Sequence, residues 1–213
     1  MKTPIVDAMN KETNSPVPAV PKPDSTAAAI LAAAREAFID KGLEATTIAA
    51  VARRAGVSRQ TVYNHYPNIR FLAASVLTQE LLQVLSLFEP APDSVDELIE
   101  CLISASNYVR DNTFVEALVR NDPQVLITYQ YQRLGTSQLY LIDTLSTIIE
   151  RLQNKAAQGE HPPLRDAAPR TIATFLLTTV QMRALSRHAL RQVADGDTWD
   201  NELQALLKGY LYS

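Results

Sequence analysis

The hydrophobic positions along this chain recur every three or four residues, which is the spacing of amphipathic helices. The clearest stripe follows Pro123 and is interrupted at Gln138; it consists of Ile127, Tyr131, Leu134, Leu141, Leu145, Ile148 and Leu152. No segment alternates apolar and polar residues between turn dipeptides, as a half-buried strand does, and the 213 residues include only six glycines. The pattern predicts an all-α fold.

Capping residues and helix breakers set the expected ends of these helices. Ser94 and Glu97 have the spacing of a capping box. Gly42 and Pro67 are stop signals, and Pro123 suits a first helical turn. The predicted helices cover 26–41, 47–55, a short stretch between Ser58 and Pro67, 68–88, 94–111, 114–121, 123–157, 167–193 and 198–211.

Charge is distributed unevenly over this helical pattern. Residues 45–70 contain four arginines and no acidic residue, whereas residues 71–213 contain 11 basic and 17 acidic residues. A basic cluster is most often only a solvated face. Here it coincides with a tight turn between two short helices, and that local geometry changes the interpretation.

The turn has the features of a helix-turn-helix. Thr47 is a suitable N-cap, Gly56 can adopt a positive φ, and Ser58 can cap the helix that follows. Two short helices joined in this way meet at a steep angle. In a helix-turn-helix the second helix enters the major groove of DNA and presents its N-terminal residues to the base edges.

The second helix has one apolar and one polar face. Val62 and Tyr66 lie four residues apart and are expected to pack inward. Of the outward residues, Arg59 can bind guanine, Gln60 can pair with adenine, and the methyl group of Thr61 can touch a thymine methyl.

Other polar groups nearby suit the phosphates, which position a protein on DNA without specifying a sequence. The absence of acidic residues is expected, because a carboxylate there would repel the DNA backbone. The expected DNA-binding residues are Thr47, Ser58, Arg59, Gln60, Thr61, Tyr63, Asn64, His65 and Arg70.

This region closely resembles the N-terminal DNA-binding domain of the TetR family of bacterial transcriptional regulators. The resemblance covers residues 30–77, ILAAAREAFIDKGLEATTIAAVARRAGVSRQTVYNHYPNIRFLAASVL. Shared features include Phe38 in an Ala-rich first helix, the TT pair, the AGVS turn and the TVYNHYPN segment. One departure is visible: many members carry a phosphate-contacting Lys where this chain has Ile69, with Arg70 one residue later.

The resemblance implies how the chain is organised. Five of the 12 prolines fall in the first 23 residues, so residues 1–23 are expected to be a flexible tail. Residues 24–70 would form the helix-turn-helix DNA-binding domain. The resemblance assigns residues 71–213 to a helical domain that binds a small molecule and forms a homodimer through its last two long helices.

Candidate residues for both tasks can be named in that second domain. Aromatic, hydroxyl and cationic side chains of a kind that lines ligand pockets are Tyr108, Phe114, Tyr129, Arg133, Tyr140, Phe175 and Arg183. The alternative is that the tyrosines are ordinary core-edge residues and that Arg183 pairs with an acid such as Glu100. Candidate dimer-interface residues are Ile172, Thr179, Leu203, Leu207 and Tyr210.

The sequence contains no recognisable catalytic, metal or cofactor signature. His65, His161 and His188 are scattered, Cys101 is the only cysteine, and HExxH, GxSxG and phosphate-binding glycine motifs are absent. No apolar run is long enough to span a membrane. We therefore expect a cytoplasmic protein that is not an enzyme and needs neither a metal nor a cofactor.

These observations lead to one expected function and two alternatives. The expected function is a ligand-responsive regulator, a repressor, that binds a palindromic DNA operator as a homodimer and is released by an unknown small-molecule effector. The first alternative is a DNA-binding protein without small-molecule control. The second is a protein-interaction helical module with a degenerate DNA-binding domain, an interpretation that Ile69 favours.

Overall fold

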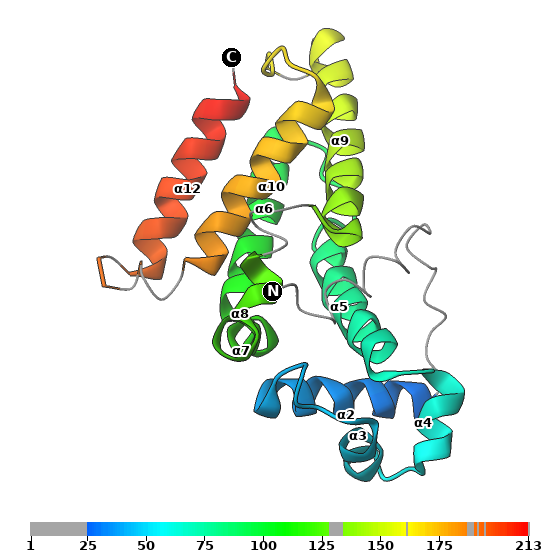
Figure 1. Cartoon of the computed structure of the whole chain (residues 1–213). Coiled ribbons are helices and arrows are strands. Elements are labelled where there is room, and N and C mark those ends of the chain that lie inside the picture. The colour runs from blue at the N-terminus through cyan, green and yellow to red at the C-terminus, as the bar shows by residue number, and fades with distance from the viewer. Residues whose placement is uncertain are drawn as a thin grey trace. The chain divides into compact units, whose positions relative to one another are not determined.

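A computed structural model describes residues 25–127, 134–160, 162–186, 190, 192–193 and 195–212. The helices in Figure 1 are α2 (Ser25–Lys41), α3 (Ile48–Ala55), α4 (Arg59–His65), α5 (Ile69–Ser86), α6 (Val95–Asp111), α7 (Thr113–Asn121), α8 (Pro123–Ile127), α9 (Thr136–Ala157), α10 (Pro169–Leu185) and α12 (Gly196–Leu211). The described residues form no strands beyond an isolated bridge between Leu164 and Tyr212. The all-α prediction is confirmed.

Two predicted helices were too long. The expected single helix over 123–157 is wrong, because α8 ends at Ile127, α9 begins at Thr136, and Leu134 and Gly135 between them are not helical. A glycine inside a helix costs roughly 1 kcal/mol relative to alanine, and this cost favours an interruption at Gly135. The helix expected over 167–193 is shorter as well, since α10 ends at Leu185.

The chain divides into two compact units. Unit 1 comprises the described residues up to Leu82 together with Asn112–Ser137, and unit 2 comprises Gln83–Asp111 and Gln138–Ser213. The chain therefore passes between the units within α5, between α6 and α7, and before most of α9. The functional division predicted at residue 70 is a different one and stays a prediction.

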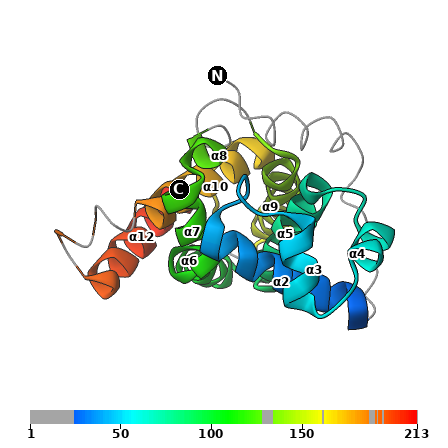
Figure 2. The same ribbon diagram turned by 60° about the horizontal axis from the view of Figure 1, so that its bottom comes forward.

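Unit 1 is built around α2, which packs against α3 and α7. Figure 2 shows the short helices α3 and α4 beside α2. Alanines along α2 let its neighbours approach closely, and larger side chains fill the remaining space. The core includes Ile30, Phe38, Val51, Val62, Leu72 and Phe114, each at most 2% exposed.

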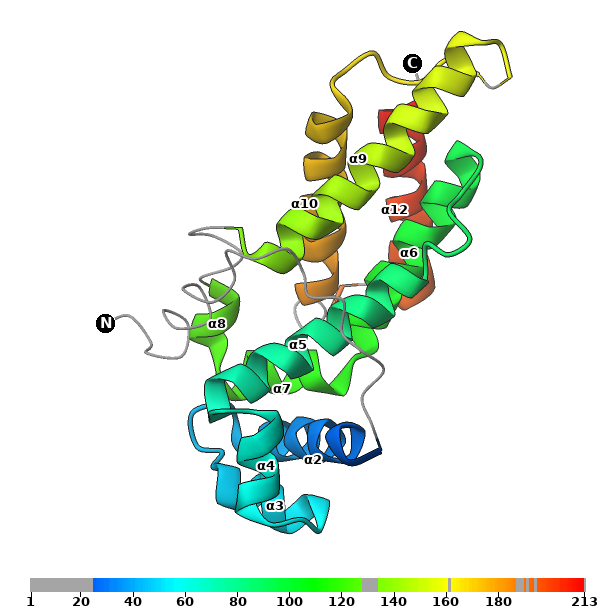
Figure 3. The ribbon, with the colours of Figure 1, turned by 90° about the vertical axis from the view of Figure 1, so that its right-hand side faces the viewer.

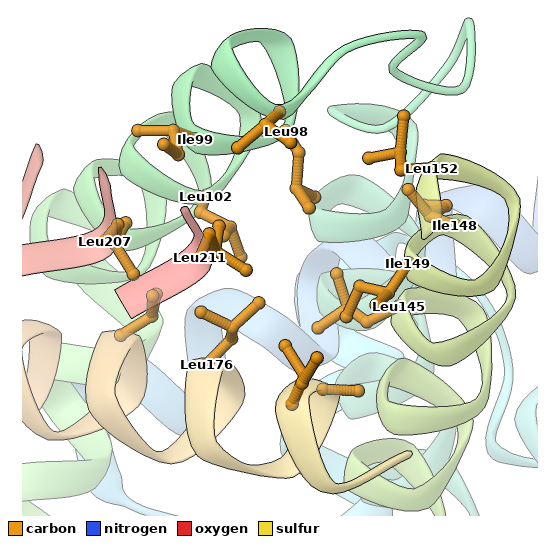
Figure 4. Packing of buried hydrophobic residues seen from close by; sticks show 14 of the residues in the cluster. Leu98, Ile99, Leu102, Leu145, Ile148, Ile149, Leu152, Leu176, Leu207 and Leu211 are labelled. Carbon is orange, nitrogen blue, oxygen red and sulfur yellow. The ribbon is translucent and has the colours of Figure 1, made fainter. Parts of the chain in front are cut away.

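Unit 2 is a bundle in which α6 packs against α10 and α12, and Figure 3 shows α9 crossing obliquely in front of α10 and α12. In Figure 4, leucine and isoleucine side chains from all four helices point into one core, among them Leu98, Ile149, Leu176 and Leu207. Gln138, which interrupts the stripe on α9, is buried, and its Nε2 donates a 2.9 Å hydrogen bond to Oε1 of Gln181 on α10. The polar residue in the stripe therefore has a polar partner, which is itself half-buried.

None of the described helices is both long and apolar enough to cross a membrane.

Candidate nucleic-acid interface

The turn between α3 and α4 forms as its sequence predicts. The hydroxyl oxygen of Thr47 accepts a 3.2 Å hydrogen bond from the amide of Ala50 and so caps α3. Gly56 ends α3 with φ of 68°, a conformation that residues with a Cβ rarely adopt. The amide of Val57 then donates to the carbonyl of Ala52 at 3.0 Å, which closes the turn.

The two threonines before α3 have different roles. Thr46 is buried, and its hydroxyl lies 2.7 Å from the carbonyl oxygen of Gly42 and 3.2 Å from that of Ala37. It therefore anchors the loop to the end of α2. Thr47 is exposed. The sequence analysis named only Thr47, because the tertiary structure decides which of the two threonines faces α2.

The helix α4 is held to unit 1 by its apolar face. Val62 has no exposed surface and Tyr66 is 7% exposed, which fixes the rotation of the helix about its axis. At the start of α4 the hydroxyl oxygen of Ser58 accepts a 3.0 Å hydrogen bond from the amide of Thr61. Seven residues are too few for a stable isolated helix, so the cap and the two buried side chains position α4.

The opposite face of α4 is polar and open to solvent. Arg59, Gln60 and Asn64 are exposed, Tyr63 is 49% exposed, and Thr61 and His65 are half-buried. The Nε2 of Gln60 donates to Oδ1 of Asn64 at 3.0 Å, which orients the Gln60 amide along the helix. The six side chains proposed to face DNA thus lie on one short helix, with no acidic residue among them.

The four arginines of residues 45–70 are not equivalent. Arg54 hydrogen bonds to Asp40 at 2.5 Å and lies 3.8 Å from Glu36; the Asp40 bond is the main reason that the pKa of Arg54 is raised. Within the described residues, Arg53 and Arg59 form no ion pair. The sequence count of four positive charges therefore overstates the basic face, because the acids that neutralise Arg54 come from α2.

Arg70 lies in the first turn of α5. It is half-buried, and the helix start beside it is capped by Asn68, whose Oδ1 accepts a 2.8 Å hydrogen bond from the amide of Phe71. The positive end of the helix dipole and the Arg70 guanidinium lie close together along the chain, an arrangement that favours an anion. Whether Arg70 replaces the Lys expected at position 69 stays a prediction.

A polar cluster that sequence reasoning missed fastens α2 to α5 and α7. Nε of Arg35 donates to Glu80 at 2.6 Å, and Nδ2 of Asn112 donates to the same carboxylate at 2.5 Å. Oδ1 of Asn112 also accepts from the amide of Phe114 at 2.8 Å and caps α7. The partners are 32 to 77 residues apart in the chain, so no local sequence motif predicts these contacts.

The candidate ligand residues do not all lie in one unit. Phe114 is 1% exposed in the core of unit 1, whereas Tyr108, Tyr140, Phe175 and Arg183 belong to unit 2. Tyr140 and Phe175 are 42% and 41% exposed. The two remaining candidates, Tyr129 and Arg133, lie outside the described residues.

Arg183 forms the centre of a polar cluster in unit 2. It donates to Ser106 at 2.7 Å, to Asn107 at 2.8 Å and to the carboxylate of Asp200. Burial, and next the charge of Arg110, lower the pKa of Arg183. The acid that pairs with it is Asp200 on α12. Glu100, named as an example in the alternative interpretation, is exposed on α6.

The candidate interface residues fall into two groups. Ile172, Leu203 and Leu207 are at most 5% exposed and lie in the core of unit 2. Thr179 and Tyr210 are half-buried, and the Tyr210 ring stacks on Phe175 with centroids 4.2 Å apart.

Among the described residues, no three His, Cys, Asp or Glu side chains are grouped so that they could hold a metal ion.

Comparison with known protein sequences finds transcriptional regulators. A family model described as "Bacterial regulatory proteins, tetR family" matches residues 30–76. An uncharacterised HTH-type transcriptional regulator of Mycobacterium tuberculosis is 31% identical over 187 residues, which are 87% of this chain and 94% of that protein. The Bacillus subtilis regulator YdeS is 31% identical over 99 residues, 46% of this chain and 48% of its own length.

Solved structures share the fold over most of the chain. GusR of Salmonella enterica superposes with a TM-score of 0.63 at 24% identity, covering 90% of this chain and 98% of its own. NalD of Pseudomonas aeruginosa, the secondary repressor of a multidrug efflux pump, gives 0.64 at 21% identity, with 89% and 97% covered. FadR of Bacillus subtilis, solved in complex with stearoyl-CoA, gives 0.59 at 18% identity, with 84% and 96% covered.

Proposed function

The chain belongs to the tetR family of bacterial regulatory proteins, and from that membership we propose that this transcriptional regulator is a repressor that binds a palindromic operator as a homodimer and is released by a small molecule. One observation carries the DNA-binding part of the proposal. Val62 and Tyr66 are buried and fix α4 so that its acid-free polar face is presented to solvent.

The reading of bases is assigned to the start of α4. Arg59 would bind guanine O6 and N7, Gln60 would pair with adenine, and Thr61 would contact a thymine methyl. Gln60 must turn its amide away from Asn64 to make this contact, so their 3.0 Å hydrogen bond is exchanged for one to the base. Each good bidentate contact supplies about 1–3 kcal/mol of discrimination between bases.

Phosphate contacts are assigned to groups at the edges of the reading helix. Thr47 and Ser58 lie at the starts of α3 and α4, where backbone amides and the helix dipole favour anions. Tyr63, His65 and Arg70 complete the set. These contacts would position the protein on the duplex without adding sequence preference.

Dimerisation is assigned to the outward face of α10 and α12. Phe175, Met182 and Leu206 are 41%, 44% and 50% exposed, and an open hollow of about 700 Å³ between the two helices is lined mainly by apolar atoms. Exposed apolar surface of this kind favours association, and a second copy would cover it symmetrically. Ile172, Leu203 and Leu207 would support this face from behind, within the subunit core.

Effector binding is assigned to unit 2. Tyr108, Tyr140, Phe175 and Arg183 are the candidate contacts, and all four belong to this unit. An anionic effector at Arg183 would compete with Asp200 for the guanidinium. The effector would favour a dimer in which the spacing between the two copies of α4 does not match the operator half-sites. It can lower the DNA affinity only by as much as its own affinity differs between this dimer and the DNA-binding one.

The reading helix can be tested by operator binding at fixed salt. Operator DNA would first be selected from genomic fragments with the purified protein. Arg59→Ala and Tyr63→Phe should then weaken binding to the selected site, whereas Arg170→Ala, which removes an exposed arginine of unit 2, should not. Unchanged affinity in both α4 variants would show that α4 is not the reading helix.

The ligand response has its own test. Compounds that raise the melting temperature of the protein would be titrated into the operator complex, and at least one should lower its DNA affinity. If compounds bind unit 2 and DNA affinity never changes, the protein is a DNA binder without small-molecule control. If the wild-type protein shows no salt-dependent DNA binding at all, the helical module with a degenerate DNA-binding domain is the better description.

A further inference from the structure

Unit 1 contains an open hollow of about 460 Å³ beside the reading helix. It lies along α3 and the turns at either end of that helix. Its wall carries three cations, Lys41, Arg53 and Arg59; the other lining residues are Ala45, Thr47, Ala49, Ala50, Ala52 and Val57. No acidic side chain is part of this lining, and Glu44 in the adjoining loop is exposed outside it.

The three cations are available for an external anion. In the described part of the chain, no carboxylate lies within ion-pair distance of Lys41, Arg53 or Arg59. The neighbouring Arg54 is different, since Asp40 and Glu36 already neutralise it. Of these two consecutive arginines on α3, Arg54 is paired with carboxylates and Arg53 is not, and Arg53 is the one that lines the hollow.

The size and the lining of the hollow suit a polymer backbone. Four of its residues are alanines, and their short side chains leave room for a bulky group to approach α3. At roughly 30 Å³ per water molecule, 460 Å³ holds more than a single phosphate group. Thr47 uses its oxygen as the cap acceptor, so its hydroxyl hydrogen can still be donated to an anion.

We propose that this hollow receives the sugar-phosphate backbone of DNA and that Lys41 and Arg53 are phosphate-binding residues in addition to those of α4. The inference rests on the proposed function, because it assumes that α4 occupies the major groove. The first helix of a helix-turn-helix crosses the DNA backbone when the second lies in the groove. The cations on α3 then meet the phosphates that flank the bases read by Arg59.

The test is the salt dependence of binding to a mixed-sequence DNA duplex, which requires no knowledge of the operator. The slope of log K against log salt becomes shallower by about 0.9 for each phosphate contact that is lost. Lys41→Ala and Arg53→Ala should each show this change. Arg54→Ala is the matched control, because its charge is already compensated, and its slope should equal that of the wild type.

The possible outcomes separate the inference from the proposed function. If the wild type binds DNA and Arg53→Ala keeps the wild-type slope, the hollow does not hold the backbone, although the reading helix can still be correct. If Arg53→Ala and Arg54→Ala change the slope equally, only the net charge matters, and the inference is overturned. If the wild type shows no salt-dependent binding, the proposed function itself fails.

Two further measurements distinguish DNA backbone binding from a folding defect and from a small-anion site. Arg53→Lys keeps the charge and should restore the wild-type slope, whereas a folding defect would not be rescued in this way. Inorganic phosphate at constant ionic strength tests for a free anion. If phosphate raises the melting temperature of the wild type more than that of Arg53→Ala while the DNA slopes are equal, the hollow is a small-anion site and the DNA assignment is overturned.

Discussion

The backbone amide of Leu43 donates a 2.9 Å hydrogen bond to Oδ2 of Asp122, a buried contact between residues 79 positions apart. It joins the loop after α2 to the end of α7. Close by, Arg120 and Asn121 donate to the carbonyl oxygen of Ile39 at 3.4 and 3.2 Å. The end of α7 and the residue that follows it therefore satisfy backbone groups left without partners where α2 ends.

Removing the Asp122 carboxylate should destabilise unit 1. In Asp122→Ala the buried amide of Leu43 loses its acceptor, which costs about 1–3 kcal/mol in the free energy of unfolding. Asp122→Asn keeps one acceptor oxygen and should lose less. Chemical denaturation of both variants provides the measurement, and equal stability of wild type and Asp122→Ala would contradict the assigned role.

Two glycines with similar backbone angles should respond differently to alanine. Gly42 and Gly56 have φ of 82° and 68°, so each alanine costs about 1–2 kcal/mol in backbone strain. A Cβ on Gly42 would also lie 2.9 Å from Oδ2 of Asp122, whereas one on Gly56 would meet nothing within 4 Å. Gly42→Ala should therefore lower the melting temperature more than Gly56→Ala, and the reverse order would refute the packing argument.

The ion pair between Arg183 and Asp200 should matter for stability more than a surface pair. Their side chains are 10% and 25% exposed, and removing one partner leaves a charge in a poorly solvated place. We expect Arg183→Ala to cost about 2–4 kcal/mol.

A surface pair in the same unit provides the comparison. Arg170 and Asp143 are 59% and 57% exposed, so Arg170→Ala should cost about 0–1 kcal/mol. A double-mutant cycle measured by urea denaturation should give a large coupling energy only for Arg183 and Asp200. Similar coupling energies for the two pairs would show that burial does not strengthen this contact.

The start of α12 should lose stability in acid. Hydrogen bonds from Thr198, first from its backbone amide and then from its hydroxyl, hold the pKa of Asp195 below its ordinary value. The pKa of Asp195 is lower in the folded state than in the unfolded state. The stability that the ionised carboxylate contributes is therefore complete above the ordinary pKa of about 3.9 and disappears as the pH falls through the folded-state pKa.

Asp195→Asn keeps a capping oxygen but cannot titrate. The difference in unfolding free energy between wild type and Asp195→Asn should therefore be constant above about pH 5 and change only in more acidic solution, near and below the ordinary Asp pKa. Thermal denaturation from pH 7 to 3 measures it, with Asp166→Asn as a control at an exposed loop position. A constant difference over the whole range would contradict the shift.

Local features of the DNA-binding region were predictable from the sequence. Thr47 and Ser58 cap their helices as expected, and Gly56 adopts the positive φ that its place at the end of a helix suggested. The Ser94 hydroxyl accepts from the amide of Glu97 at 3.2 Å, although the Glu97 carboxylate bonds back to the amide of Asp93 at 2.7 Å. Interactions within about four residues can be read from sequence because the helix geometry itself fixes those distances.

The sequence by itself determined the all-α class, most helix ends, and which face of α4 is polar. Only the tertiary structure decided which charges are neutralised and which apolar residues face inward: Arg54 pairs with α2, Arg183 pairs with Asp200, and Leu207 lies in the core of unit 2. The physical reason is that periodicity defines a helix face but not the neighbour against which it packs. Such neighbours come from distant parts of the chain, and only folding brings them into contact.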